Sequence, residues 1–146
     1  MQAPVDIVRQ FVFECWGEGH ISLVHSLIHP NYVANESLWG PEAVVANIQA
    51  YRSAFPDLVV NITECVAQND SVAMLIRLRG THLHRWMGIE ATGRPFDFSE
   101  AAFWTIQDGK IFRGQFVAQS LSLRIQLGQI PPEVWSGVLL TKQEEV

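Results

Sequence analysis

The dipeptide Asp108-Gly109, placed between two stretches of alternating apolar and polar residues, constrains the fold of this chain more than any other feature. Asp-Gly favours a two-residue turn with positive φ angles, and such turns join neighbouring antiparallel strands. We therefore predict a strand over 94–106 that returns through 111–119. Gln107 then lies opposite Lys110, and this pairing sets the register of the hairpin.

Glu100 stands on the apolar face of the first of these strands. Because successive strand residues point to opposite faces, Glu100 shares its face with Phe96, Phe98, Ala102, Trp104 and Ile106. A carboxyl group among apolar neighbours resists ionisation, and a raised pKa suits a general acid or base near neutral pH. An exposed edge position, or pairing with an arginine, is the structural alternative.

Two glutamines are predicted to join Glu100. The hairpin register sets Glu100 opposite Val117, which makes it diagonal to Gln115 and Gln119. Three long polar side chains then converge on an otherwise apolar surface, where each needs a hydrogen-bond partner. We therefore expect these side chains to bind one another, water or a ligand.

Two histidines follow a third predicted strand. The apolar phase of Met74, Ile76 and Leu78 extends to His82 and His84, and either imidazole could carry a proton near neutral pH. We predict His82 as a second catalytic residue and His84 as a substrate contact, with a partly exposed structural histidine as the alternative for His84. No third nitrogen or sulfur ligand is identifiable from spacing, so we predict no metal site.

The composition indicates one globular domain, since the chain has 146 residues of which 48% are hydrophobic. We expect this domain over 1–130 and a C-terminal tail over 131–146. A net charge of −5 argues against a nucleic-acid partner, and no apolar run reaches the ~18 residues that span a membrane. With no secretory signal and two widely separated cysteines, we expect a cytoplasmic protein.

Helical spacing dominates the first third of the chain, over 5–15, 21–28 and 41–51, and strands follow. Helices first and antiparallel strands afterwards is an α+β order. We predict a strongly curved, mainly antiparallel sheet whose concave face is covered by the N-terminal helices, with a pocket between the two layers.

Five short motifs support a family resemblance. In chain order they are Phe55-Pro56-Asp57-Leu58, Gly80-Thr81-His82, Gly88-Ile89 with Ala91-Thr92-Gly93-Arg94, Asp108-Gly109-Lys110-Ile111, and Gln126-Leu127-Gly128. Together they resemble the SnoaL-like polyketide cyclases of the nuclear-transport-factor-2-like superfamily, over residues 5 to 128. The resemblance implies a cone-shaped α+β barrel whose bent sheet encloses a hydrophobic pocket.

The resemblance also implies chemistry. Family cyclases typically close a ring by an intramolecular aldol step without metal or coenzyme, using an Asp on the last strand and often a Trp four residues before it. Those positions are Gln119 and Gln115 here, and a histidine often found in the family becomes Asn35, whereas His82 is retained. Since a neutral amide cannot abstract a proton from carbon, we expect Glu100 to replace the family Asp.

Three functions stay open at this point. The first is a cofactor-independent cyclase or isomerase of polyketide-like metabolism, in which Glu100 and His82 are catalytic. The second is an epoxide-opening hydrolase or ether-ring cyclase, similar in fold to limonene-epoxide hydrolases, in which Glu100 activates water or an internal hydroxyl. The third is a non-catalytic protein that binds a hydrophobic metabolite. We expect no metal and no coenzyme.

The expected substrate is a small, mostly apolar molecule with a few oxygens, held by aromatic walls and oriented by polar side chains. The predicted substrate-binding residues are Gln115, Gln119, His84, Tyr32, Asn35, Trp39, Tyr51, Phe55, Phe98 and Trp104.

A homodimer is predicted from the opposite, convex face of the hairpin, which is too apolar to face water. Its residues in the predicted register are Ala101, Phe103, Phe112, Phe116 and Ala118. The resemblance also implies dimerisation through this sheet surface. A C-terminal tail folded over the patch is the alternative.

Overall fold

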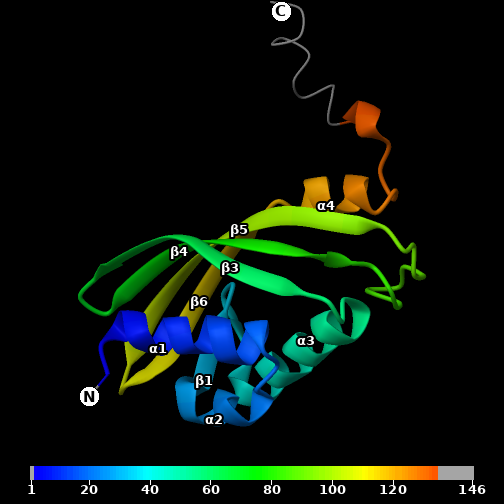
Figure 1. The fold of residues 1–146 in the computed structure, drawn as a ribbon. Helices are drawn as coiled ribbons and strands as arrows, with labels where there is room; N and C mark the ends of the chain where they lie inside the picture. The colour runs from blue at the N-terminus through cyan, green and yellow to red at the C-terminus, as the bar shows by residue number, and fades with distance from the viewer. Residues whose placement is uncertain (1, 135–146) are drawn as a thin grey trace, which may run out of the picture.

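A curved six-stranded sheet arches over the N-terminal helices in the computed structural model, which describes residues 2–134 (Figure 1). The helical segments are α1 (Pro4–Gln10), its π-helical continuation (Phe11–Gly17), a 3₁₀ turn (Ile21–Leu23), α2 (Val24–Leu27), α3 (Gly40–Ala54) and α4 (Ser120–Gln126). The strands are β1 (Ile28–Ala34), β2 (Ser37–Leu38), β3 (Val59–Gln68), β4 (Ser71–Thr81), β5 (Pro95–Gln107) and β6 (Lys110–Ala118).

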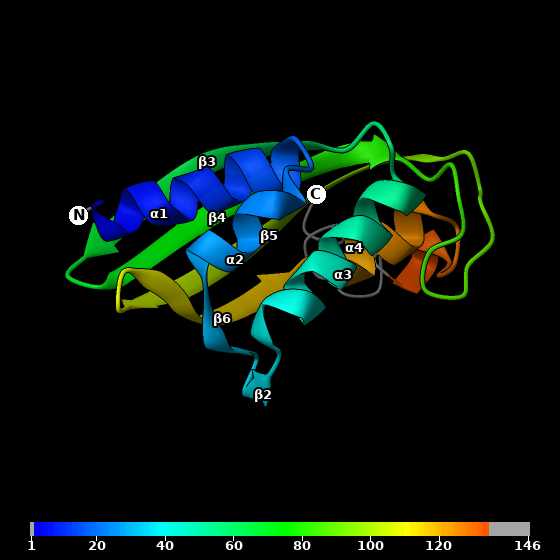
Figure 2. The same ribbon diagram turned by 90° about the horizontal axis from the view of Figure 1, so that it is seen from below.

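The sheet has the order β2-β1-β6-β5-β4-β3, in which β1 and β6 run parallel and the other neighbours run antiparallel. Seen from below, α1 and α3 lie across different parts of the concave face, with α2 between them (Figure 2). The predicted α+β fold with covering N-terminal helices is confirmed. The sheet is strongly curved but open, with β2 and β3 as its edges.

The helices form where the apolar spacing predicts them. Pro4 occupies the first turn of α1, where its missing N–H costs nothing, and the buried stripe runs from Ile7 to Cys15 through the π-helical turn. Pro41 likewise occupies the first turn of α3, which begins at Gly40, and Ile48 lies fully buried on the inner face of this helix. These two buried stripes bring the helices against the sheet.

The hairpin turn is as predicted, but its register changes one step beyond the turn. Asp108 and Gly109 have positive φ angles, and Gln107 lies opposite Lys110. A β-bulge then adds Phe112 to β6, so that Thr105 lies opposite Arg113. The predicted pairing is therefore wrong from this point on.

The bulge exchanges the two faces of β6, because side chains alternate along a strand. Glu100 lies opposite Ala118 rather than Val117. Phe116 and Ala118 consequently share the concave face with Glu100, and Gln115 and Val117 point outward and are exposed. The prediction that Gln115 faces the pocket is wrong for this reason, as is the outward placement of Phe116 and Ala118.

A carboxylate binds the last residue of β4, Thr81. Asp57 accepts hydrogen bonds from the backbone N–H of Thr81 at 2.8 Å and from its hydroxyl at 2.7 Å, which holds the loop before β3 against the end of β4. These contacts lower the pKa of Asp57, and the Thr81 hydroxyl is the main cause.

Beyond Thr81, His82 still exchanges backbone hydrogen bonds with Gly93 and Arg94, and it is buried as the predicted phase requires. The N–H groups of Leu83 and His84 donate instead to the carbonyl of Ala54, so His84 lies outside the strand and is exposed.

Two glutamine side chains pair with β5 after β6 has ended. The N–H of Ser99 donates to Gln119 Oε1 at 3.1 Å, and Gln126 both accepts from the N–H of Asp97 and donates to its carbonyl. Each such bond adds about 0.5–1.5 kcal/mol to stability. Gln119, just before α4, and Gln126, its last residue, thus hold α4 against the sheet.

Among residues 2–134, no helix is both long enough and apolar enough to cross a membrane. The predicted C-terminal tail over 131–146 lies largely outside the described residues, which end at 134.

Candidate active site

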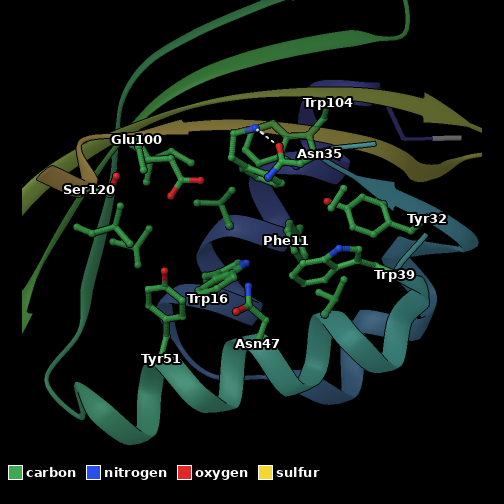
Figure 3. Close-up of a pocket in the computed structure, with 18 residues that line it drawn as sticks. Phe11, Trp16, Tyr32, Asn35, Trp39, Asn47, Tyr51, Glu100, Trp104 and Ser120 are labelled. Atoms are coloured by element: carbon green, nitrogen blue, oxygen red, sulfur yellow. Dashed lines mark hydrogen bonds between the residues drawn. The ribbon is translucent and has the colours of Figure 1, made fainter. Parts of the chain in front are cut away.

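A cavity of about 440 Å³ lies between the concave face of the sheet and the helices (Figure 3). The π-helical turn contributes Trp16, α3 contributes Asn47 and Tyr51, and β5 contributes Glu100 and Trp104. This volume lies in the range of sites that bind small organic molecules.

Among residues 2–134, Glu100 provides the only carboxyl group that lines this cavity. Its side chain has no hydrogen-bond or salt-bridge partner in the part of the chain that the structure describes, and in Figure 3 it points into the cavity. Burial raises the pKa of Glu100 to about 7, and no neighbouring charge offsets this. Near neutral pH the carboxyl group can therefore both take up and release a proton.

Neutral polar groups surround this acid. Tyr32 and Tyr51 line the cavity, and burial followed by the negative charge of Glu100 raises the pKa of both phenols. Asn47 and Ser120 add an amide and a hydroxyl. Within the described part of the chain, the lining residues include no Lys, Arg or His, so this part of the site offers hydrogen bonds without a compensating positive charge.

Asn35 is held in one orientation at the cavity wall. Its backbone N–H donates to the carbonyl of Gly114 at 3.0 Å, and its Oδ1 accepts from the N–H of Phe116 at 3.0 Å (Figure 3). Because Oδ1 is used in this bond, the amide NH₂ is the group left for other partners.

The structure gathers half of the twelve predicted site residues at the cavity. They are Tyr32, Asn35, Trp39, Tyr51, Glu100 and Trp104. The other six lie elsewhere, for four different physical reasons.

His82, Phe55 and Phe98 belong to a packed aromatic cluster and do not line the cavity. The ring of Phe55 lies 5.8 Å from His82 and 4.6 Å from Phe96, which in turn contacts Phe98. His82 is fully buried, with Nδ1 hydrogen-bonded to the Thr92 hydroxyl at 3.0 Å and Nε2 without a partner in the described structure. Direct contact with a ligand in this cavity is thus not available to His82.

His84, Gln115 and Gln119 are exposed. His84 follows the end of β4, and the bulge turns Gln115 outward. Gln119 lies beyond the end of β6, where its side chain is occupied by the N–H of Ser99. The predicted convergence of two glutamines on Glu100 is therefore wrong.

Five polar or aromatic lining residues were not among the predicted site residues: Phe11, Trp16, Asn47, Phe116 and Ser120. Asn47 lies three residues after Val44 and four before Tyr51, a spacing that places all three on the inner face of α3 and could have identified it. Trp16 follows Val12 by four residues and could have been found similarly. Ser120 carries no such signal, since its position depends on how the chain leaves β6.

No group of three or more His, Cys, Asp or Glu side chains suited to a metal ion occurs within residues 2–134.

Comparisons with known proteins agree with this architecture. The profile of the SnoaL-like polyketide cyclase family matches residues 6–127. The aklanonic acid methyl ester cyclase DnrD of Streptomyces peucetius is 30% identical, over 92% of this chain and 99% of its own length. The aklanonic acid methyl ester cyclase DauD of Streptomyces sp. (strain C5) is 28% identical, over 92% of this chain and 89% of its own.

Two solved structures show the same fold at lower identity. TsrD from Streptomyces laurentii has a TM-score of 0.81 and 24% identity, over 89% of this chain and 98% of its own. IdmH from Streptomyces antibioticus has a TM-score of 0.77 and 24% identity, over 87% of this chain and 99% of its own.

Proposed function

Because this chain belongs to the SnoaL-like polyketide cyclase family, we propose that it closes a carbon ring in a polyketide-type substrate, with Glu100 as the proton-transfer group. The observation that carries the proposal is the position of Glu100: of the residues that the structure describes, it alone brings a carboxyl group to the cavity, and burial brings its pKa to about 7. A general base is most effective when its pKa lies near the working pH.

The proposed reaction is an intramolecular aldol addition. The Glu100 carboxylate takes a proton from a carbon next to a carbonyl group, and the resulting enolate carbon bonds to a second carbonyl carbon of the same molecule. The new alkoxide then takes the proton back from Glu100. No atom is gained or lost, so the product is an isomer of the substrate and the enzyme needs no metal or coenzyme.

We propose a neutral substrate with several oxygens and a polycyclic or polyene-like carbon skeleton. The lining residues between positions 2 and 134 carry no positive charge, so a substrate carboxylate would find no counterion among them and would face the charge of Glu100. An ester at that position avoids both costs. Aklanonic acid methyl ester, the compound in the names of two relatives, is accordingly the first substrate to assay.

The experiment is incubation of the purified protein, dialysed against a chelator, with aklanonic acid methyl ester. We expect conversion to a product of identical mass and different retention time, as in cyclisation. Saturable binding without conversion would contradict catalysis on this substrate and favour a binding protein. Addition of one water molecule to an epoxide-bearing probe of similar size, with no conversion of the ester, would instead indicate the epoxide-opening alternative.

We also propose a homodimer, formed through an outer patch of the sheet that consists of Val66, Ala73, Leu75, Ala101, Phe103 and Val117. The strand pairings place these side chains in two adjacent rows, and Phe103 is 54% exposed, Val117 63% and Val66 69%. A contiguous apolar patch of this kind is typical of an interface. Light scattering at micromolar concentration is expected to give twice the mass of one chain. For Val117→Asp it is expected to give the mass of a single chain. A monomeric mass for the unaltered protein would contradict the dimer.

A further inference from the structure

Negative charge must appear on a substrate oxygen when Glu100 removes a proton from carbon. The described residues that line the cavity provide no Lys, Arg or His to balance that charge. Hydrogen-bond donors that are already in position are the remaining means of stabilising it, and in a water-poor site their effect is large. The cavity wall therefore has to supply a neutral donor.

Tyr32 is the most deeply buried hydroxyl side chain of the cavity. It projects from β1, is only 2% exposed, and has no hydrogen-bond partner for its hydroxyl in the described part of the chain. Figure 3 shows this hydroxyl directed into the cavity from the side opposite Glu100. The Tyr51 hydroxyl is directed instead toward the side that carries Glu100 and Ser120.

Gly114 creates the space that Tyr32 occupies. It lies fully buried in the middle of β6, opposite Trp104. A Cβ atom at Gly114 would overlap the Tyr32 hydroxyl and would come within 2.9 Å of the Phe116 ring. A glycine within a strand weakens it and often marks a close approach, which here is the approach of a hydroxyl group.

We propose that the Tyr32 hydroxyl donates a hydrogen bond to the substrate oxygen that becomes negatively charged as Glu100 removes the proton. The inference rests on the proposed function for the identity of the base. Glu100 and Tyr32 face the same cavity from opposite sides, so a substrate bound between them would meet the base on one side and the phenol on the other. Burial also raises the pKa of Tyr32, which keeps the phenol protonated.

A phenolate probe tests this hydrogen bond without turnover. 2-Naphthol carries an oxygen that is neutral or anionic according to pH, and its two forms differ in absorbance and fluorescence. In the Glu100→Gln protein, which lacks the opposing charge, we expect bound 2-naphthol to ionise at least about one pH unit lower than in Glu100→Gln/Tyr32→Phe, a tenfold change in phenolate population. Equal ionisation in both proteins, or no binding to Glu100→Gln, would overturn the proposal.

Kinetics provide the second measurement. Tyr32→Phe is expected to lower kcat by about 10²-fold with little change in KM, as for loss of one donor to a developing oxyanion. Tyr51→Phe is expected to have the smaller effect of the two, and a larger loss in Tyr51→Phe would assign the donor to Tyr51 instead.

The two hypotheses fail separately. An active Glu100→Gln protein whose 2-naphthol titration still depends on Tyr32 would contradict the proposed base and keep the donor. An inactive Glu100→Gln protein whose titration does not depend on Tyr32 would keep the base and contradict the donor.

Discussion

Glu100→Gln is expected to lower turnover by about 10²- to 10⁴-fold, the range that general acid–base catalysis typically provides. Gln keeps the size and polarity of the side chain but cannot accept a proton from carbon. Substrate affinity, measured by tryptophan fluorescence, is therefore expected to change little. Glu64→Gln, the same substitution at an exposed position on β3, serves as the matched control and is expected to leave turnover unchanged.

Glu100→Gln is also expected to raise the melting temperature when it is measured above pH 7. Burial raises the pKa of Glu100 from 4.5 to about 7, so between these values the folded chain holds a proton that the unfolded chain has released. The free energy of unfolding due to this group thus falls as pH rises through that window, and the loss is complete above pH 7. Gln does not ionise, so the variant does not lose this part of the free energy of unfolding. A lower melting temperature with activity retained would show instead that Glu100 is structural.

Gly114→Ala is expected to destabilise the protein by about 1–3 kcal/mol, as other overpacked cores do. The added methyl group would collide with the Tyr32 hydroxyl and the Phe116 ring, and both side chains would have to move. For a chain of this size each kcal/mol lowers the melting temperature by roughly 2–4 °C. Because Tyr32 is displaced, turnover is expected to fall as well.

Gly17→Ala is the matched control for this substitution. Its new Cβ would lie 3.5 Å from the nearest atom, the carbonyl oxygen of Val12, which is an ordinary contact. We expect little change in melting temperature for Gly17→Ala. Equal melting temperatures for both variants would contradict the packing of Tyr32 against Gly114.

The sequence predicts the fold well because its strongest signals are local. The Asp108-Gly109 turn and the alternation through β5 predict the hairpin, and alternation alone places Glu100 on the apolar face. The bulge at Phe112 has no such signal. An extra residue in one strand changes neither the turn nor the apolar content, yet it moves Gln115 from the concave face to the exposed one.

The candidate site is less predictable because its residues come from segments distant in the chain. Tyr32 on β1, Asn47 on α3 and Glu100 on β5 meet only after the sheet has curved around the helices. The position of Gln119 depends on where β6 ends, and its side chain is used to pair with Ser99. Spacing along one strand cannot reveal contacts of this kind.

The pH dependence of kcat/KM for the unaltered protein tests the role of Glu100 most directly. If the carboxylate is the base, kcat/KM is expected to rise about tenfold per pH unit up to a midpoint near 7, where burial places the pKa of Glu100, and then to level off. The residual activity of Glu100→Gln is expected to lack this rise. A flat profile through pH 7, or the same midpoint in Glu100→Gln, would contradict the assignment of Glu100 as the base.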